Sequence, residues 1–259
     1  MPRESKAPDE IRTYALQPEG TQFEQLIASV RFEDVGKGRR GTVLTRIDET
    51  VGIPIVRNTT QYSAPAQRFW AVHEQLALQI QESASLPVGF NNALIETYTN
   101  AYATMGAHSD QALDLADESF IAVFSCYEHP ALAEPSRKLV VESQESGSEP
   151  WEIPLTQGSV VVFSVAANRR LKHKIVLEKT FGTPENRWLG ITFRTSKTLI
   201  QFRGGSAYFS DGESLTLADD EQRREFYKLR RRENDELDFA YPRITYTISA
   251  SDLMPPESF

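Results

Sequence analysis

Cysteine is nearly absent from this chain, since Cys126 is the only one among 259 residues. A lone cysteine cannot form an internal disulfide, which excludes a disulfide-stabilised scaffold and fits a reducing compartment. Cys126 stands in the apolar run 120–127, so we expect it to be a small buried core residue.

Long hydrophobic runs are also lacking. The longest, such as residues 160–163, are far shorter than the ~20 residues that a membrane-spanning helix needs. The amino-terminal residues MPRESK lack the apolar stretch of a signal peptide. We therefore expect a cytoplasmic protein with no membrane partner.

Positive charge is in deficit, with 28 Lys and Arg against 36 Asp and Glu and a net charge of −8. This balance argues against a broad phosphate-binding surface, although a local patch can still act within an acidic protein. The basic segment 36–41 (GKGRRG) could contact phosphate as a flexible loop, but it lacks the Gly-Lys-Ser/Thr ending of a P-loop. The basic residues of 223–232 alternate with glutamates, so we expect a solvated helix face there.

The amino-terminal part carries two helix signals. Thr21-x-x-Glu24 is typical of a capping box and predicts a short helix. A second helix is predicted from Ser63, with Pro65 in its first turn. Its buried face would consist of Phe69, Val72, Leu76 and Ile80.

Short β-type runs follow at 94–99, 119–126, 138–143, 151–155, 159–165, 173–178 and 188–202, with a hairpin loop indicated at 145–150. A last helix is predicted over 219–234 and a strand over 243–248. This order predicts a β-rich α+β fold. We expect a closed or sandwiched β core, buttressed by the amino-terminal helices and followed by a carboxy-terminal helix.

Histidine is scarce as well, with four residues at 73, 108, 129 and 173. His108 and Asp110 would share one face of a strand, and His173 could complete a face of three metal ligands. Two imidazoles and one carboxylate leave the other positions of an octahedral metal open, which suits non-haem Fe(II) with a chelating co-substrate and dioxygen. Alternatively, each histidine is a satisfied core residue and Asp110 a turn or cap residue. His73 and His129 have no partner at a useful spacing and are expected to pack or to face solvent.

The flanking segments carry a wider pattern. Residues 90–98 (FNNALIETY), His108-Ser109-Asp110, 158–163 (GSVVVF), His173 and 191–194 (ITFR) follow in an order that resembles the AlkB-like Fe(II)/2-oxoglutarate dioxygenases, across about residues 50 to 200. The resemblance implies a double-stranded β-helix (jelly roll), bound Fe(II), 2-oxoglutarate as co-substrate, dioxygen, and oxidation of a C–H bond. From length and composition we expect one domain over 1–259, with 1–90 as an amino-terminal helical or lid extension, 91–203 as the β-helix core, and 204–259 as the carboxy-terminal helix and strand.

The resemblance assigns roles to individual residues. Tyr98 would hydrogen-bond 2-oxoglutarate, and Arg194 would pair with one of its carboxylates, because a planar guanidinium can donate two parallel hydrogen bonds. If Arg194 is the only guanidinium that reaches the co-substrate, we expect Thr192 or Tyr98 to supply neutral hydrogen bonds. The metal would be held by His108, Asp110 and His173.

The chain departs from the family pattern at two positions. Glu96 stands where an asparagine is usual, two residues before Tyr98, and its charge would lie close to a dianionic co-substrate. Glu96 is therefore protonated, redirected, or paired with a cation.

The second departure is Trp188, which stands where an arginine is usual, six residues before Arg194. The nearest arginine is Arg187, and residues seven apart on a regular strand face opposite sides. Arg187 therefore reaches the co-substrate only if a bulge breaks the alternation, for which Gly190 offers a site. Otherwise Arg194 is the sole guanidinium on the co-substrate.

The substrate stays open. Many members of this family act on alkylated nucleobases and carry an acidic residue two positions after the metal aspartate, but here that position is Ala112, which cannot accept a hydrogen bond from a base. Tyr62, Phe69 and Trp70 could stack on a flipped base. The predicted activity is hydroxylation or demethylation of an alkylated nucleobase or, alternatively, of a small metabolite or protein side chain. A non-catalytic binding module on the same fold is the third alternative.

Overall fold

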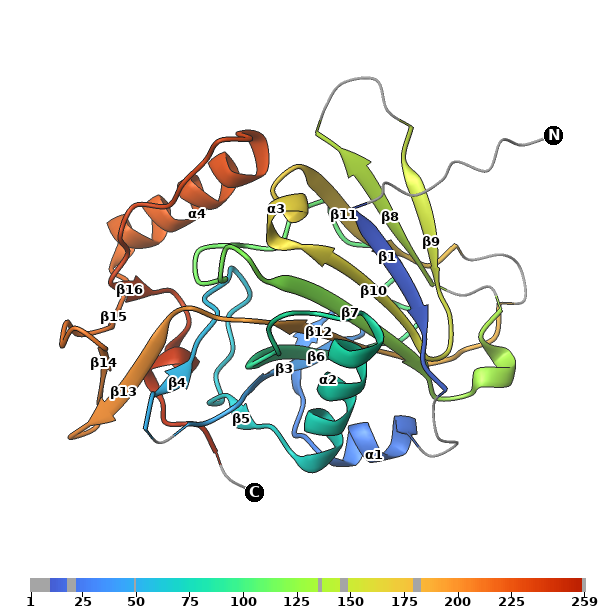
Figure 1. Ribbon diagram of the computed structural model, residues 1–259, viewed down its shortest axis with the longest axis horizontal. Helices are drawn as coiled ribbons and strands as arrows, with labels where there is room; N and C mark the ends of the chain where they lie inside the picture. Colours follow the sequence, from blue (N-terminus) through green and yellow to red (C-terminus); the bar gives the residue numbers. More distant parts are fainter. Residues whose placement is uncertain are drawn as a thin grey trace.

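The computed structural model describes residues 10–17, 22–48, 50–134, 137–144, 149–178 and 183–257. Half of its strands are gathered in one large, mainly antiparallel sheet (Figure 1). In spatial order these strands are β1 (Ile11–Ala15), β10 (Ser159–Ser164), β7 (Phe120–Tyr127), β12 (Trp188–Arg194), β6 (Asn92–Tyr98), β3 (Arg39–Thr45) and β2 (Glu33–Gly36). The short β5 (Gln67–Arg68) pairs in parallel with β3. The predicted β-rich α+β class is confirmed.

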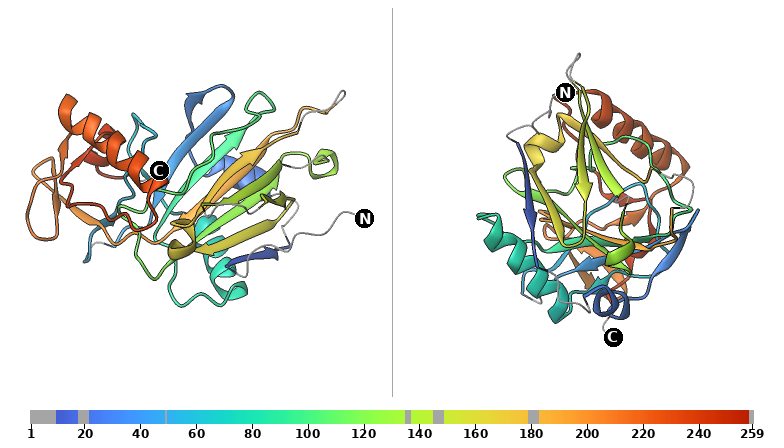
Figure 2. Two further views of the ribbon diagram at one scale, coloured as in Figure 1. Left: turned by 90° about the horizontal axis from the view of Figure 1, so that it is seen from above. Right: turned by 90° about the vertical axis from the view of Figure 1, so that its right-hand side faces the viewer.

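A second, three-stranded sheet packs on one face of the large sheet (Figure 2). Its strands, in spatial order, are β11 (Leu171–Val176), β8 (Arg137–Ser143) and β9 (Trp151–Leu155). Val123 and Phe163 of the large sheet share one buried cluster with Leu139 and Ile153 of the small sheet. Along β11 buried and half-buried residues alternate, which turns His173 toward the interior.

The other face of the large sheet is covered by α1 (Gln22–Ala28) and α2 (Ala71–Ser83). Leu26 of α1 and Ile80 of α2 pack with Phe124 and Ile191 of the sheet, and each such buried side chain contributes about 1.5–3 kcal/mol. The predicted buttressing role of these helices is confirmed. Cys126 belongs to the same core, as expected, and burial raises the pKa of its thiol.

The beginning of α2 differs from the prediction. The helix starts at Ala71 and not at Ser63, because the preceding segment pairs with other parts of the chain. Gln67 lies in β5, and its side chain accepts a hydrogen bond from the N–H of Arg31 (2.9 Å) and donates one to the same residue's carbonyl (2.7 Å). Thr21, the other predicted helix start, lies outside the described residues.

The predicted strands of the central segment all have counterparts, but the run 188–202 is two strands. It breaks after β12 because residues 195 and 197 exchange backbone hydrogen bonds with the loop 114–116. The chain resumes as β13 (Leu199–Arg203), which pairs with β14 (Ser206–Phe209) and β4 (Ile53–Pro54). The strands of the first ninety residues, β1 to β5, are not among those that the sequence indicates. Residues 145–148 of the predicted hairpin loop lie outside the described residues.

The carboxy-terminal helix is confirmed as α4 (Asp220–Asp235). It begins at a capping box, in which Asp219 accepts from the N–H of Gln222 (2.8 Å) while the Gln222 side chain accepts from the N–H of Asp219 (3.0 Å). Phe226 packs this helix on Ile244. The shorter remaining elements are η1 (Pro130–Leu132), α3 (Val165–Asn168), β15 (Thr216–Leu217), β16 (Tyr246–Thr247) and η2 (Ala250–Leu253). The strand predicted over 243–248 is shorter in the structure, where it forms only as β16.

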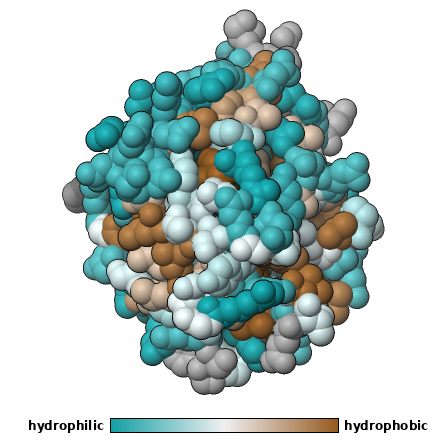
Figure 3. All heavy atoms as spheres, turned by 90° about the vertical axis from the view of Figure 1, so that its left-hand side faces the viewer, coloured by the Kyte–Doolittle hydropathy of each residue, from teal (hydrophilic) through white to brown (hydrophobic). Residues whose placement is uncertain are grey.

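The surface on the α4 side of the molecule is mostly hydrophilic, with separate hydrophobic patches (Figure 3). This agrees with the dense charge of both signs along α4. Among the described residues, no helix is both long and apolar enough to cross a membrane.

Candidate metal centre

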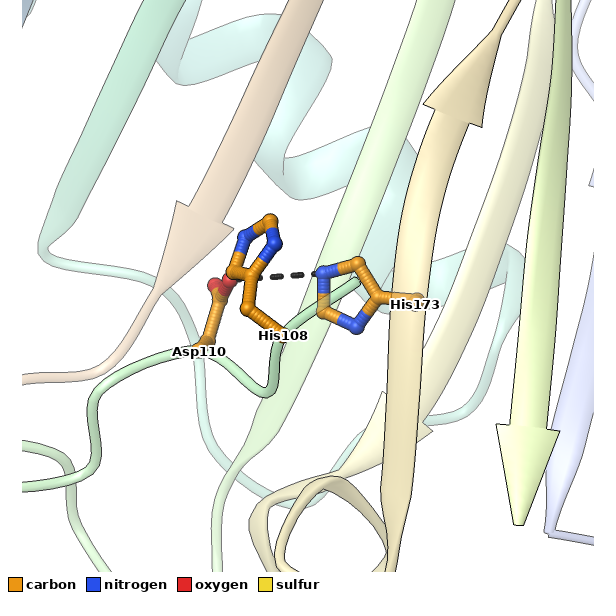
Figure 4. A group of neighbouring side chains, drawn as sticks. All are labelled: His108, Asp110 and His173. Atoms are coloured by element: carbon orange, nitrogen blue, oxygen red, sulfur yellow. Dashed lines mark ion pairs between the residues drawn. The ribbon is translucent and has the colours of Figure 1, made fainter. Parts of the chain in front are cut away.

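The three side chains predicted as metal ligands come together where β11 meets the loop before β7. His108 and His173 form an isolated antiparallel bridge, with N–H···O distances of 3.0 Å and 2.7 Å. His108 and Asp110 thus lie in an extended loop rather than on the regular strand that we expected, and this bridge sets their direction. One possible ligand atom from each of the three residues lies within 4.8 Å of the others, and Figure 4 shows the side chains pointing toward one another. Among these three side chains, the ionic contact joins His173 Nε2 and Asp110 Oδ1 at 3.5 Å.

The protonation states suit cation binding. Burial, with a contribution from His173, lowers the pKa of His108 to about 4, so this imidazole is neutral at neutral pH. His108 Nδ1 lies 2.9 Å from the Gly106 carbonyl, which can only accept, so Nδ1 carries the proton and Nε2 keeps its lone pair. Burial would raise the pKa of Asp110, but Arg194 and His173 outweigh it and hold the pKa well below its usual range. A neutral imidazole and an ionised carboxylate are the forms that bind metal.

Two residues fix the position of Asp110. Asn168, at the end of α3, accepts from the backbone N–H of Asp110 and donates to its carbonyl, both at 2.7 Å. Arg194 of β12 donates to Oδ2 of the carboxylate from Nε (2.8 Å) and Nη2 (2.6 Å). Because Arg194 is bound to Oδ2, Oδ1 is the oxygen that faces His173. Contacts of this kind orient a metal ligand and tune its charge.

Helix α4 holds the rest of the ligand loop. Asn234 Oδ1 accepts from both the backbone N–H and the hydroxyl of Ser109, each at 3.1 Å. Arg230 donates to the carbonyl of Ser109 and pairs with Glu233 at 2.6 Å. Glu233 in turn accepts from the N–H of Ala112 at 2.7 Å. Three residues of one helix therefore bind the backbone on both sides of Asp110.

The cluster lines a cavity of about 410 Å³. Side chains of β6 and β12 that face the small sheet form much of its wall, namely Leu94, Glu96, Tyr98, Thr192 and Arg194. Their neighbours in sequence point the other way, since Ile95 and Phe193 lie in the core under the helices. Strict alternation along two paired strands therefore brings the predicted co-substrate residues Tyr98, Thr192 and Arg194 to the same cavity.

Glu96 pairs with a cation, which is one of the three alternatives that the sequence left open. Its Oε1 accepts from Arg39, with distances of 2.7 Å to Nε and 2.5 Å to Nη2, and its Oε2 accepts from the Tyr98 hydroxyl at 2.7 Å. Burial alone would lower the pKa of Arg39, but Glu96, Tyr98 and Tyr62 outweigh it and raise that pKa. Burial and Glu96 also raise the pKa of Tyr98, which keeps its phenol protonated as a donor.

Arg187 lies outside the cavity. The register between β12 and β6 is continuous from Trp188 to Arg194, so no bulge forms at Gly190 and the alternation is unbroken. Arg187 binds Glu128 instead, donating from Nε at 2.7 Å and from Nη2 at 2.5 Å. We therefore correct the expectation that Arg187 contributes to the cavity.

Gly190 serves a different purpose. A Cβ at this position would lie 2.0 Å from Cη2 of Trp188, so the indole ring lies directly over the glycine. The ring also packs against Tyr98, with 4.8 Å between centroids. The tryptophan that replaces the usual arginine is therefore a buried part of the wall behind Tyr98. Within the part of the chain that the structure describes, its Nε1 has no hydrogen-bond partner.

The residue after Asp110 also belongs to the cavity. Gln111 is 6% exposed, lines the cavity, and finds no hydrogen-bond partner among the described residues at either Oε1 or Nε2. Ala112, in contrast, is buried and lines a separate cavity of about 570 Å³ together with residues of the carboxy-terminal segment. None of the aromatic residues suggested for base stacking, Tyr62, Phe69 and Trp70, lines the 410 Å³ cavity.

Several residues of the site were not predicted from the sequence. Arg39 belongs to the basic segment 36–41, which forms the turn between β2 and β3 and the start of β3. The excess charge of Glu96 signals that a cation must be near, but nothing in the sequence says which one. Asn168 and the loop-binding residues of α4 give no signal in spacing or composition. The remaining histidines behave as expected, since His73 is buried against Ser29 (2.9 Å) and His129 is exposed.

Comparison with known proteins gives structural likenesses alone. The chain matches no protein-family model and no curated protein. Among solved structures it is similar to "The structure of OsALKBH1", with a TM-score of 0.43 and 15% identity over 63% of this chain and 83% of that one. It is also similar to a prolyl-4-hydroxylase of Pseudomonas putida, with a TM-score of 0.41 and 14% identity over 72% of this chain and 92% of that one. The His-x-Asp…His cluster is present at His108, Asp110 and His173, as predicted.

Proposed function

We propose that this chain is an Fe(II)- and 2-oxoglutarate-dependent dioxygenase. The observation that carries the proposal is the convergence of His108, Asp110 and His173 in one cavity, with His108 neutral and Asp110 ionised, which are the forms that bind a cation. Two imidazoles and one carboxylate fit Fe(II), and ligands on one side leave other coordination positions open. The two packed antiparallel sheets support a double-stranded β-helix core over 91–203, to which 1–90 adds the strands β1, β2, β3 and β5 and 204–259 adds α4, as parts of one domain.

The cavity residues have separable roles in this proposal. His108 Nε2, Asp110 and His173 would hold the metal, while Tyr98, Thr192 and Arg194 would bind the co-substrate. When bound, Fe(II) and 2-oxoglutarate supply the activation of dioxygen for oxidation of a C–H bond. Arg194 keeps Asp110 ionised and in place.

Two substrate classes are candidates for this site. Hydroxylation and demethylation use the same oxidation of a C–H bond, so both fit this site. An alkylated nucleobase is one candidate substrate. The buried Ala112 offers no acceptor to an exocyclic amine, because its methyl group cannot accept a hydrogen bond and lies outside the 410 Å³ cavity, and its carbonyl accepts from the N–H of Leu115 at 3.2 Å. This observation favours a small metabolite or a protein side chain as the second candidate.

The test is oxygen-dependent conversion of 2-oxoglutarate to succinate. Protein purified without oxygen would receive Fe(II) and 2-oxoglutarate, and succinate would be followed after air is admitted. We expect succinate from the wild type and none from His173→Ala. The control is His129→Ala, which removes an exposed histidine outside the cavity and should leave turnover unchanged.

Addition of nucleic acid, peptides or metabolites would then show which substrate class accelerates turnover. Absence of succinate together with absence of 2-oxoglutarate binding to the metal-loaded protein would reject the oxygenase. A non-catalytic binding module would then be the better description.

A further inference from the structure

The cavity contains a carboxylate-binding arrangement that is occupied by the chain's own Glu96. Arg39 and Tyr98 converge on this side chain from β3 and β6, and each binds a different oxygen. A guanidinium on one oxygen and a hydroxyl on the other is a complete set of donors for a carboxylate. All three residues line the same cavity as the metal ligands.

The other arginines of this cavity are already bound. Arg194 donates to the metal ligand Asp110 with both Nε and Nη2. Arg230 pairs with Glu233 of its own helix and donates to the carbonyl of Ser109. In the described part of the chain, three arginines line the cavity: Arg39, Arg194 and Arg230. Only Arg39 has a partner, Glu96, that neither belongs to the ligand loop nor binds it.

Residue 188 of β12, where the family pattern has an arginine, supplies no cation next to Tyr98. It is Trp188, whose ring lies over Gly190 and against Tyr98. Arg187, the nearest arginine in sequence, is bound to Glu128 outside the cavity. A distal carboxylate next to Tyr98 therefore meets Arg39, while Arg194 of β12, which lies on Asp110, is left for the other carboxylate of the co-substrate.

We propose that Arg39 and Tyr98 form the subsite for the distal carboxylate of the 2-oxo acid, and that Glu96 competes with this carboxylate for the same donors. The inference rests on the proposed function and assigns a residue of β3, outside the predicted core, to co-substrate binding. Two carboxylates cannot share one set of donors, so the co-substrate must turn Glu96 out of the subsite. Glu96 thereby weakens binding of dicarboxylates but has no effect on the 2-oxo acid head at the metal.

The experiment compares two 2-oxo acids that differ at the distal end. The Kd of 2-oxoglutarate and of 2-oxobutyrate, which lacks the distal carboxylate, would be measured by calorimetry on the full chain loaded with Mn(II) and kept free of oxygen. In Glu96→Gln we expect 2-oxoglutarate to bind about tenfold more tightly, with 2-oxobutyrate unchanged within about twofold.

A second variant removes Arg39 without leaving Glu96 buried and unpaired. In the double variant Arg39→Gln/Glu96→Gln we expect 2-oxoglutarate to bind about 10- to 100-fold more weakly than in Glu96→Gln, and 2-oxobutyrate to bind as before. The matched control is Arg40→Gln, because Arg40 is the next residue of β3 and donates to the exposed carbonyl of Phe32. This control should leave both affinities unchanged.

Equal binding of 2-oxoglutarate by the single and double variants would overturn the role of Arg39. Equal changes for both 2-oxo acids would also overturn it, because the effect would then not concern the distal carboxylate. In either case the oxygenase assignment stands, since both acids still bind the metal-loaded protein. Failure of the metal-loaded wild type and variants to bind either acid would reject the subsite and the proposed function together.

Discussion

Removal of the Asn168 side chain should weaken both the fold and the metal centre. In Asn168→Ala the buried N–H and C=O of Asp110 lose partners at 2.7 Å. An unsatisfied buried polar group costs about 1–3 kcal/mol, so the free energy of unfolding should fall by roughly 2–4 kcal/mol. The Asp110 carboxylate would also lose its fixed position, and loss of such a supporting contact typically lowers metal affinity by about 10–100-fold. Urea unfolding and titration with Mn(II) measure the two effects.

The chain offers a matched control in Asn186. Its amide forms the same pair of bonds with the backbone of His129, accepting from the N–H at 3.1 Å and donating to the carbonyl at 2.9 Å. Asn186→Ala should therefore reduce stability by a smaller amount, because the backbone of the exposed His129 can bind water instead, and should leave metal affinity unchanged, because His129 is outside the cavity. If both variants lower metal affinity equally, the effect comes from general loss of stability, and the reasoning about Asp110 is refuted.

Three further predictions concern stability. Gly190→Ala should lower the free energy of unfolding by about 1–3 kcal/mol, because the new Cβ would meet the Trp188 ring, and Trp188→Phe should recover part of the loss; an unchanged urea midpoint would contradict this. Gln111→Leu should raise the free energy of unfolding by about 1–2 kcal/mol, since it removes two buried polar atoms without partners; a decrease would show that the amide is satisfied. Burial lowers the pKa of His73 from 6.5 to about 4. Between these pH values the imidazole binds a proton in the unfolded chain but not in the folded one. The free energy of unfolding should therefore decrease by up to about 3 kcal/mol as the pH falls from 6.5 to about 4. His73→Gln should flatten that pH dependence in urea unfolding, and an unchanged slope would contradict the assignment.

The clustering of His108, Asp110 and His173 could be predicted because the flanking segments support the pattern, which is weak as a short His-x-Asp motif alone. His108 and Asp110 are two residues apart, and His173 lies in a run with clear β character. The alternation argument also identified the correct condition for Arg187, which was a bulge in β12. The continuous register shows that the condition is not met.

The supporting residues could not be predicted because they reach the site through long-range contacts. Arg39 and Glu96 are 57 residues apart, Asn168 and Asp110 are 58 apart, and Glu233 and Ala112 are 121 apart. No periodicity connects positions at such separations. The same reason explains why the first residues of the predicted second helix, from Ser63 on, are not helical. Pairing of Gln67 with β3 and Arg31 prevails there over the local helix signals.

The dependence of the ligand loop on α4 has a consequence for biosynthesis. A ribosome has made all three metal ligands once His173 is added, but Arg230, Glu233 and Asn234, which hold the loop, come later in the chain. At about 5–20 residues per second, the interval from His173 to Arg230 lasts about 3–12 s. During that time the nascent chain carries the ligands without the helix that orders them. Iron loading should therefore follow translation of α4, and a chain that is cut before α4 would keep every ligand but bind the metal weakly.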